Sequence, residues 1–367
     1  MSKTSKGQVS AISQISAGWS AVCDEGASSL PFLRPEWFTA FADSFGEKIK
    51  VLSTRKDAGL TSILPLSAGS GSLHGVPVRV LRSAYNLNTP RFDLIHTNDS
   101  NSRREVTREL WESIKHDSSW DVLEFRLVPH ESWLHDILLL ADGEGHRTGV
   151  WEMDGAPYVA IPEGETVDDA VKSYFSGSRK RFNKELDRRL RRLQEMGNVD
   201  FCVTDDYDAA TMRTFFDVES SGWKGRMGTA AANNPNVVRL HEEFASSSAA
   251  RGALSTYQLK LDGKTIAISL NIRFGSKIAH WKTAYDESYS QYAPGNLLFR
   301  ELVRNCARDG ISEIDLLSPA LPYKLVWSTG VREHSALYVF RKGLIGKLLW
   351  AWKFKLALNL RNLAKKH

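Results

Sequence analysis

Three consecutive runs of strand-forming residues, separated by two very short turns, restrict the fold of the second half more than any other feature. The runs are Leu254–Leu261, Thr265–Phe274 and Ile278–Tyr285. Asp262-Gly263 and Gly275-Ser276 lie between them, and dipeptides of this kind form tight turns between neighbouring antiparallel strands. The sequence therefore predicts a three-stranded antiparallel meander.

Helices and further strands flank this meander. We expect helices around 167–196 and 207–222 before it, and a loop ending in Pro294-Gly295 that leads into a helix over Asn296–Arg308. The order is expected to end with strand Ser312–Leu317, a short helix near 320–328 and strand Ala336–Phe340. Strands and helices that alternate in this way predict an α/β fold.

The first half shows a similar order with weaker signals. Its expected helices are 9–24, Pro35–Phe45, Arg103–Lys115 and Glu131–Asp142, and its expected strands are Ile49–Thr54, Leu60–Leu66, Val76–Leu81 and Trp120–Leu127. A Gly/Ser-rich loop is expected at Ala68–Ser72. Asp57-Ala58-Gly59 matches Asp262-Gly263 as a hairpin turn. The matching order suggests an internal duplication.

Length and composition are those of an ordinary globular protein. The chain has 367 residues, of which 42% are apolar and 25% are charged, which suits about two domains. The cysteines Cys23, Cys202 and Cys306 are far apart and odd in number, so we expect neither disulfides nor a zinc site and favour a reducing compartment. The ten histidines lack metal-binding spacing, so we expect no metal.

No secretory leader opens the chain, and no apolar run is long enough to span a bilayer. We therefore expect a soluble cytoplasmic protein that is able to lie at the inner face of a membrane.

Positive charge is concentrated in two segments. Residues 178–196 and 341–367 carry net charges of +5 and +8, whereas the whole chain carries +5. The first segment is interpreted either as a solvated helix face or as a seat for a polyanion such as tRNA, coenzyme A or lipid headgroups. The second has apolar positions at Ile345, Leu348, Leu349 and Trp352, and it either lies on an anionic membrane surface or packs on the protein body.

Two short stretches are candidates for chemistry. Pro294 and Gly295 precede a helix whose first N–H groups suit a pyrophosphate, although Pro-Gly also begins ordinary helices. Glu219 lies four residues before Trp223, on one face of a helix that we expect to end at Trp223-Lys224-Gly225. This stretch is either an acceptor pocket with Glu219 as a general base, or a glycine C-cap beside a packed tryptophan.

The motifs of the second half resemble those of the GNAT acyltransferases. The stretches that carry the resemblance are Ser178–Phe182, Glu219–Gly225, Tyr285-Asp286, Tyr292–Gly295, and Asp315 through Tyr323-Lys324. They are similar to the CelD-like branch, which is linked to cellulose and other exopolysaccharides and is related to the FemAB group. The resemblance covers residues 160–340 well, and the first half only in general layout.

The resemblance implies two GNAT-like domains, each a mixed, mainly antiparallel sheet flanked by helices. Their expected bounds are 1–152 for the N-terminal domain and 153–341 for the acyltransferase domain, followed by a basic amphipathic helix over 342–367.

The resemblance also implies roles for particular residues. The expected catalytic residues are Glu219, Asp315 and Tyr323, with Tyr323 protonating the leaving group. The donor, an acyl-coenzyme A, is expected at Trp281, Thr283, Pro294, Gly295, Asn296 and Lys324, and the strand is expected to separate from its neighbour at 281–284. The acceptor is expected at Trp223, Lys224 and Tyr285. The alternative is a structural role for both residues: Asp315 as a cap or ion-pair partner, and Tyr323 as a contact in the core.

The expected function is transfer of an acyl group, in the simplest case acetyl, from coenzyme A to an amine or hydroxyl of a cell-envelope or exopolysaccharide precursor. The usual coenzyme-A loop has two glycines, whereas Gln291-Tyr292-Ala293-Pro294-Gly295-Asn296 keeps one. Two alternatives therefore stay open: tRNA-dependent aminoacyl transfer of the FemAB type, and a catalytically silent, membrane-associated assembly factor.

Overall fold

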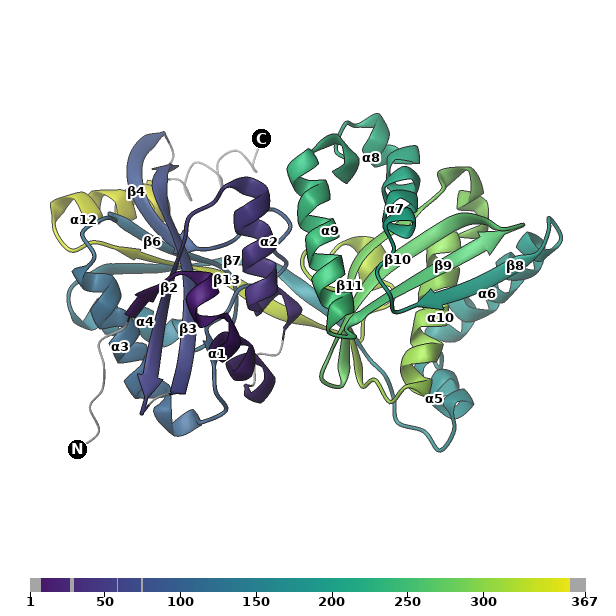
Figure 1. Ribbon diagram of the computed structural model, residues 1–367, viewed down its shortest axis with the longest axis horizontal. Coiled ribbons are helices and arrows are strands. Elements are labelled where there is room, and N and C mark those ends of the chain that lie inside the picture. The colour runs from purple at the N-terminus through teal and green to yellow at the C-terminus, as the bar shows by residue number, and fades with distance from the viewer. Residues whose placement is uncertain (1–7, 27–29, 58, 74, 357–367) are drawn as a thin grey trace. The chain divides into compact units, whose positions relative to one another are not determined.

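The chain folds into two compact units. The computed structural model describes residues 8–26, 30–57, 59–73 and 75–356. Unit 1 comprises Met1–Gly155 and Arg332–His367, and unit 2 comprises Ala156–Val331. Two strands run from one unit into the other: β7 (Arg147–Ala160) and β13 (Gly330–Phe340). Within each unit a mixed, mainly antiparallel sheet is flanked by helices (Figure 1), which is the predicted fold class.

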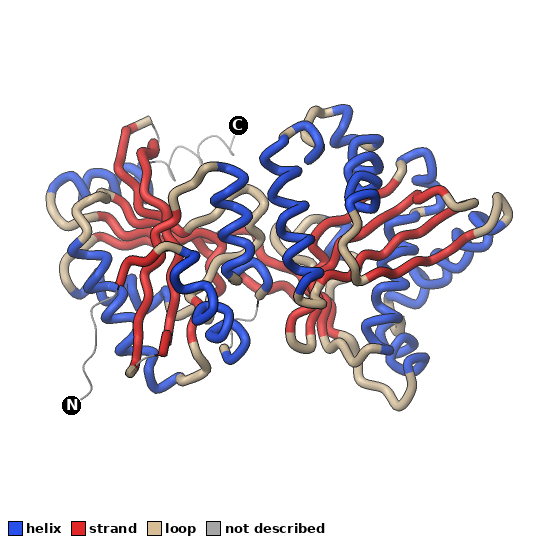
Figure 2. The backbone as a smooth tube through the Cα atoms, viewed as in Figure 1, coloured by secondary structure: helices blue, strands red, loops and turns tan. Residues whose placement is uncertain are grey.

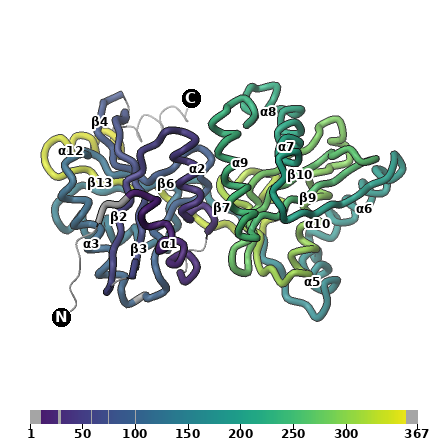
Figure 3. The backbone as a smooth tube through the Cα atoms, in the orientation of Figure 1, coloured from purple at the N-terminus to yellow at the C-terminus, as the bar shows by residue number. Residues whose placement is uncertain are grey.

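The last strand belongs with the first unit. We predicted a C-terminal domain over 153–341, yet His334–Phe340 of β13 pair antiparallel with Val122–Pro129 of β6 in unit 1, where Figure 3 labels β13. Strand pairing therefore groups these residues with unit 1, whereas the predicted domain bounds follow the order of elements along the chain. We propose the two units as the two domains, with Arg332–Phe340 moved to the first.

Unit 1 is built on the strand order β1-β2-β3-β4-β6-β13-β7. Its strands are β1 (Gln8–Ser10), β2 (Ile49–Lys56), β3 (Gly59–Leu73), β4 (Val76–Ser83), β6 (Val122–Pro129), and β5 (Ile95–His96), which pairs with β3. Its helices are α1 (Ile12–Glu25), α2 (Pro35–Phe45), α3 (Arg103–His116), α4 (Leu134–Gly143) and α12 (Leu344–Ala351). β4 and β6 are parallel, as expected for a crossover through α3.

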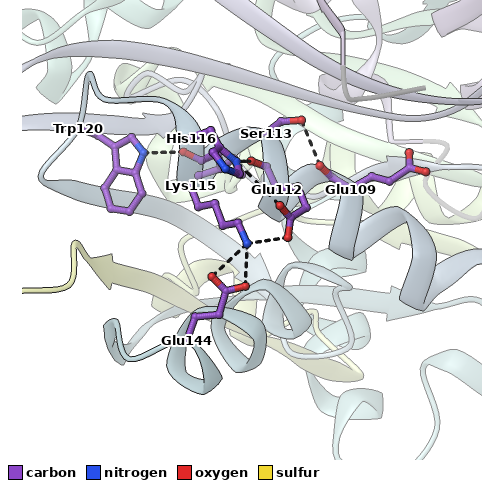
Figure 4. A network of polar contacts seen from close by, with 8 residues as sticks. Glu109, Glu112, Ser113, Lys115, His116, Trp120 and Glu144 are labelled. Carbon is purple, nitrogen blue, oxygen red and sulfur yellow. Dashed lines mark hydrogen bonds and ion pairs between the residues drawn. The ribbon is translucent and has the colours of Figure 1, made fainter. Parts of the chain in front are cut away.

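Polar contacts join the two middle helices of unit 1. Lys115 Nζ on α3 donates to Glu112 Oε1 at 2.6 Å and to Glu144 Oε1, just beyond α4, at 3.0 Å (Figure 4). Trp120 Nε1 donates to the carbonyl of Ile114 at 2.9 Å, which satisfies a buried indole. The opposite, buried face of α3 includes Leu110 and Trp111.

The predicted Gly/Ser-rich loop at Ala68–Ser72 is wrong. These residues form the second half of β3, paired antiparallel with Pro77–Leu81. Small residues fit here because a Cβ on Gly71 would come within 3.0 Å of Val80 Cγ2. Composition alone suggested a loop, but cross-strand pairing determines the outcome.

Unit 2 is built on the strand order β7-β12-β11-β10-β9-β8. Its strands are β8 (Val199–Thr204), β9 (Leu254–Leu261), β10 (Lys264–Phe274), β11 (Lys277–Tyr285) and β12 (Glu313–Asp315), with the end of β7. Its helices are α5 (Val167–Tyr174), α6 (Arg179–Gln194), α7 (Ala209–Ser221), α8 (Trp223–Arg226), α9 (Pro235–Ala250), α10 (Pro294–Arg308) and α11 (Pro322–Leu325). The predicted meander is confirmed as β9-β10-β11.

Helices cover both faces of this sheet (Figure 2). Residues of α5, α6 and α10 share one apolar core with β9, β10 and β11. The apolar residues Phe182, Leu186, Leu190 and Leu193 of α6 face that core, whereas Met196, just beyond the helix, is half exposed. The basic side of α6 is therefore left toward solvent.

Several elements were not expected from the sequence, among them β7, β8 and α9. α9 carried a usable signal, because Asn234 caps it through Asn236 N and Val237 N, and Pro235 occupies its first position. Its remaining residues are rich in alanine and serine, so its apolar periodicity is weak. The predicted helix 167–196 is also divided into α5 and α6 around Gly177, whose φ is +57°.

Candidate functional site

The β11–β12 pair separates soon after it begins. Its parallel ladder joins Lys277–Ala279 to Glu313–Asp315 and ends there, while β11 continues to Tyr285. Beyond Asp315 the backbone turns at Leu317, whose φ is +61°. The β10–β11 pairing also shifts so that Trp281 is the extra, bulged residue. The structure thus places the strand separation where we predicted it.

The start of α10 lies beside the end of β11. Ala293 adopts a left-handed conformation before Pro294, and a Cβ on Gly295 would lie 3.5 Å from Tyr285 Cδ1. Asn296 Oδ1 accepts a hydrogen bond from Trp327 Nε1 at 3.2 Å. Pro294, Gly295, Asn296 and Tyr285 are therefore brought together, and the amide side chain of Asn296 is already engaged.

Glu219 is buried and holds two groups. Its Oε1 accepts from Lys224 Nζ at 2.5 Å, and its Oε2 accepts from the backbone N–H of Ala231 at 2.8 Å. The side chain is 5% exposed. Each of its oxygens therefore already accepts one hydrogen bond. This arrangement suits a residue that positions Lys224.

The predicted helix end at Trp223-Lys224-Gly225 is wrong. α7 ends at Ser221, Gly222 is extended, and Trp223–Arg226 form the short helix α8. A Cβ on Gly225 would lie 1.8 Å from the carbonyl oxygen of Ser220, so glycine is required for this close approach. Glu219 and Trp223 consequently do not share a helix face; Trp223 is half exposed and its N–H donates to Glu287 Oε1.

Lys282 is a candidate that sequence reasoning did not assign. It follows the bulge on β11 and lies within electrostatic reach of Lys224 and Glu219. Burial, and then the charge of Lys224, lowers the pKa of Lys282 to about 8, although Glu219 raises it. A lysine with this pKa is partly neutral near neutral pH and is able to accept a proton.

His241 on α9 lies against this group. Its ring stacks on Trp281 with centroids 5.0 Å apart, and Nδ1 donates to the carbonyl of Val237 at 2.6 Å. Nε2 is buried and has no hydrogen-bond partner among the residues that the structure describes. Burial, and then the charge of Lys282, lowers the pKa of His241 to about 3, so the ring is neutral at physiological pH.

Lys324 and Asp315 meet where β12 ends. Lys324 Nζ donates to the carbonyl of Leu317 at 2.9 Å, and buried Asp315 accepts from Leu317 N at 2.9 Å. The pKa of Lys324 is lowered to about 8, mainly by burial and also by the charge of Lys282, while the charge of Asp315 acts in the opposite direction. Lys282 and Lys324 thus influence each other across the site.

The remaining predicted residues fall into two groups. The Trp281 side chain packs edge-on against Phe244, and Thr283 Oγ1 donates to the carbonyl of Ile268 at 3.4 Å. Both side chains therefore make structural contacts with neighbouring elements. Tyr323 lies on α11 next to Lys324 and is 54% exposed. Its hydroxyl makes no hydrogen bond within the described residues.

Comparisons with known proteins agree with this geometry. Residues 180–325 match the family model described as an acetyltransferase (GNAT) domain. The matched segment includes the β11–β12 separation, Lys282 and Lys324, so the similarity to a GNAT acetyltransferase domain extends over most of unit 2. Such a domain implies an acyl-coenzyme A donor. The search of curated proteins found no match.

Solved structures share the fold of nearly the whole chain. FemX is similar with a TM-score of 0.62 and 12% identity, covering 95% of this chain and 99% of that one. A conserved protein of unknown function from Bacteroides thetaiotaomicron has a TM-score of 0.56 and 10% identity, covering 93% and 100%. The C-terminal domain of a putative lysylphosphatidylglycerol synthetase from Agrobacterium fabrum has a TM-score of 0.54 and 10% identity, covering 93% and 95%.

Two searches of the described residues were negative. None of their helices combines the length and apolar character that crossing a membrane requires. Within the same residues, no three histidine, cysteine, aspartate or glutamate side chains gather in a way that would hold a metal ion.

Proposed function

We propose that the protein transfers an acyl group, in the simplest case acetyl, from coenzyme A to an amine or hydroxyl of a cell-envelope or exopolysaccharide precursor. The observation that carries the proposal is the separation of β11 from β12, with the start of α10 and two low-pKa lysines beside it, inside the segment that matches the GNAT domain. The N-terminus of α10 favours the donor pyrophosphate.

The proposed reaction is direct transfer. Neutral Lys282 takes a proton from the acceptor, while the amine nitrogen or hydroxyl oxygen of the acceptor attacks the acyl carbon. The thioester C–S bond breaks as the new bond forms, and Tyr323 supplies a proton to the departing thiolate. Backbone N–H groups of β11 beyond Ala279 polarise the carbonyl. Lys324, held by Leu317 and Asp315, adds positive charge for the developing oxyanion.

The test is thiol release from acetyl-coenzyme A with glucosamine and with a lysine-containing peptide as acceptors. We expect release that depends on one of these acceptors. If no acyl-coenzyme A releases thiol, and transfer from charged tRNA occurs and is abolished by ribonuclease, the donor is aminoacyl-tRNA. Inertness with both donors would leave the silent assembly factor.

The tRNA alternative has one observation in its favour. The outer side of α6 exposes a row of basic side chains, namely Lys180, Arg181, Lys184, Arg188, Arg191 and Arg192. Of these, Arg188 pairs with Glu185 at 2.7 Å, which reduces the charge offered to a phosphate backbone.

Tyr323→Phe is expected to lower kcat for thiol release by about tenfold while donor Kd changes less than about twofold. A positioned acid contributes more than this in a closed site, but the exposed phenol allows water to replace it. Steady-state kinetics and donor titration separate the two constants. A wild-type kcat, or an equal loss in Kd, would remove Tyr323 from proton donation.

The final helix supports a peripheral membrane role in the proposal. Of its predicted apolar positions, Leu349 packs on the sheet of unit 1 beside Trp350 and Phe354, whereas Ile345, Leu348 and Trp352 are exposed. The remainder of the predicted helix, 357–367, lies outside the described residues. A Cβ on Gly149 would lie 2.4 Å from the Phe354 ring, which explains the fit of that ring. An exposed apolar ridge among lysines, without an acid in 341–367, suits an anionic bilayer.

The double variant Ile345→Ser, Leu348→Ser should reduce co-sedimentation with phosphatidylcholine–phosphatidylglycerol vesicles by about tenfold or more, because it removes the two exposed aliphatic side chains that we expect to insert into the bilayer. Leu139→Ser is the matched control, since Leu139 is equally exposed on α4. Wild-type binding should weaken with salt. Equal sedimentation of both variants would exclude the ridge as the membrane contact.

A further inference from the structure

A cavity in unit 1 is separate from the site described above. It has a volume of about 710 Å³ and is lined by β3, β4, β6, β7, β13 and the short π-helix Trp352–Leu356 that follows α12. Cavities of 300–1,000 Å³ are the usual size for small-molecule sites. It lies on the sheet face of a small apolar core that includes Val78, Val122 and Ala336.

Three cations line this cavity. Arg126 Nη1 donates to Tyr85 Oη at 2.7 Å, while its Nε lies 3.9 Å from Glu124 Oε1. Arg82 is partly exposed and lies 3.9 Å from Glu47. Lys353 Nζ lies 4.1 Å from the centroid of the Tyr338 ring, and no carboxylate within 4.0 Å is found for it among the described residues. Glu124 and Glu47 thus oppose Arg126 and Arg82 at 3.9 Å each, and Tyr338 Oη already donates to Glu124 at 2.7 Å.

Aromatic rings and two outer carboxylates complete the lining. Tyr85, Trp151 and Tyr338 all border the cavity, so flat apolar faces lie next to the cations. Glu152 and Asp154, on the exposed side of β7, border it as well. Carboxylates in such a place accept hydrogen bonds from hydroxyl groups.

The cavity occupies the place in unit 1 that corresponds to the strand separation of unit 2. Val80–Arg82 of β4 pair in parallel with Val122–Glu124 of β6, and the ladder ends there, as the β11–β12 ladder ends at Ala279–Asp315. In unit 1 the side chains of Tyr85 and Arg126 follow this end. The first unit therefore has an opening at the same point of its sheet, with a different set of side chains.

We propose that this cavity binds a phosphorylated sugar. The phosphate contacts Arg82, Arg126 and Lys353, because none of these cations has a carboxylate oxygen closer than 3.9 Å among the described residues, so N–H donors remain for a dianion. The sugar ring lies on Trp151 and Tyr338, and its hydroxyls reach Glu152 and Asp154. The inference concerns unit 1 alone and does not depend on acyl transfer by unit 2.

Isothermal titration of the full chain with glucose 1-phosphate tests the proposal. We expect saturable binding that is at least about tenfold tighter than binding of glucose or inorganic phosphate, because each lacks half of the contacts. Arg82→Gln and Lys353→Gln should each weaken it by about tenfold, with unchanged melting temperatures. Arg79→Gln is the matched control, since Arg79 is also on β4 but pairs with Asp121.

Each contrary result overturns a part of the proposal. Absence of binding up to about 10 mM glucose 1-phosphate would overturn it entirely. Equal affinity for inorganic phosphate would overturn the sugar contact, and equal weakening by Arg79→Gln would overturn the location. The binding assay contains no acyl donor, so its failure is distinguishable from failure of the proposed acyltransferase function.

Discussion

Lys282→Met is expected to lower kcat/KM for acyl transfer by about 100-fold or more, because the variant removes the proposed general base. Methionine has a similar length without the charge, so the core around Trp281 should remain packed and the melting temperature should not fall. Steady-state thiol release measures the loss. Lys277→Met on the same strand is the matched control, because Lys277 pairs with Glu313 at the outer end of β11.

The pH dependence separates a base from a structural lysine. A base works when it is neutral, so wild-type kcat/KM should rise with pH and level off above the Lys282 pKa of about 8. Lys224→Met removes the neighbouring charge that lowers this pKa, so the rise should move to higher pH. Lys282→Met should lose the rise. Activity within about threefold of wild type, with the same pH profile, would exclude Lys282 as the base.

Local sequence signals determined much of the fold. The meander could be predicted because Asp262-Gly263 and Gly275-Ser276 leave no alternative to short antiparallel connections. The pairing of β13 with β6 could not, because these strands are about 200 residues apart and nothing in the letters of His334–Phe340 selects Val122–Pro129. Long-range pairing is a property of the folded sheet.

The candidate site shows the same division. The strand separation and the start of α10 were expected at the right residues, since they follow from the order of elements. Lys282 was overlooked because a lysine in a strand usually faces solvent, whereas here burial, and then the charge of Lys224, lowers its pKa. His241 was overlooked because α9 itself was not predicted. A list of basic residues contains no information on which ammonium groups lie side by side.

Trp327 is the residue on which the packing behind the site depends most. It is buried, and its ring lies 4.6 Å from Phe299 on α10 and 5.0 Å from Phe182 on α6, measured between centroids. Its indole N–H donates to Asn296 at the start of α10, and its carbonyl accepts from Tyr174 Oη at 2.5 Å. The same residue therefore joins α5, α6 and α10 to α11, which carries Lys324.

Trp327→Ala should lower the free energy of unfolding of unit 2 by about 3–5 kcal/mol, because it leaves a large cavity among aromatic rings. Trp327→Phe keeps an aromatic ring and loses the hydrogen bond to Asn296, so it should cost less, about 1–3 kcal/mol. Urea unfolding of the full chain measures both. Trp223→Ala is the matched control in the same unit, because Trp223 is half exposed and its truncation should cost under about 1 kcal/mol. If Trp327→Ala were no more destabilising than Trp223→Ala, contacts other than those of Trp327 would hold the three helices together.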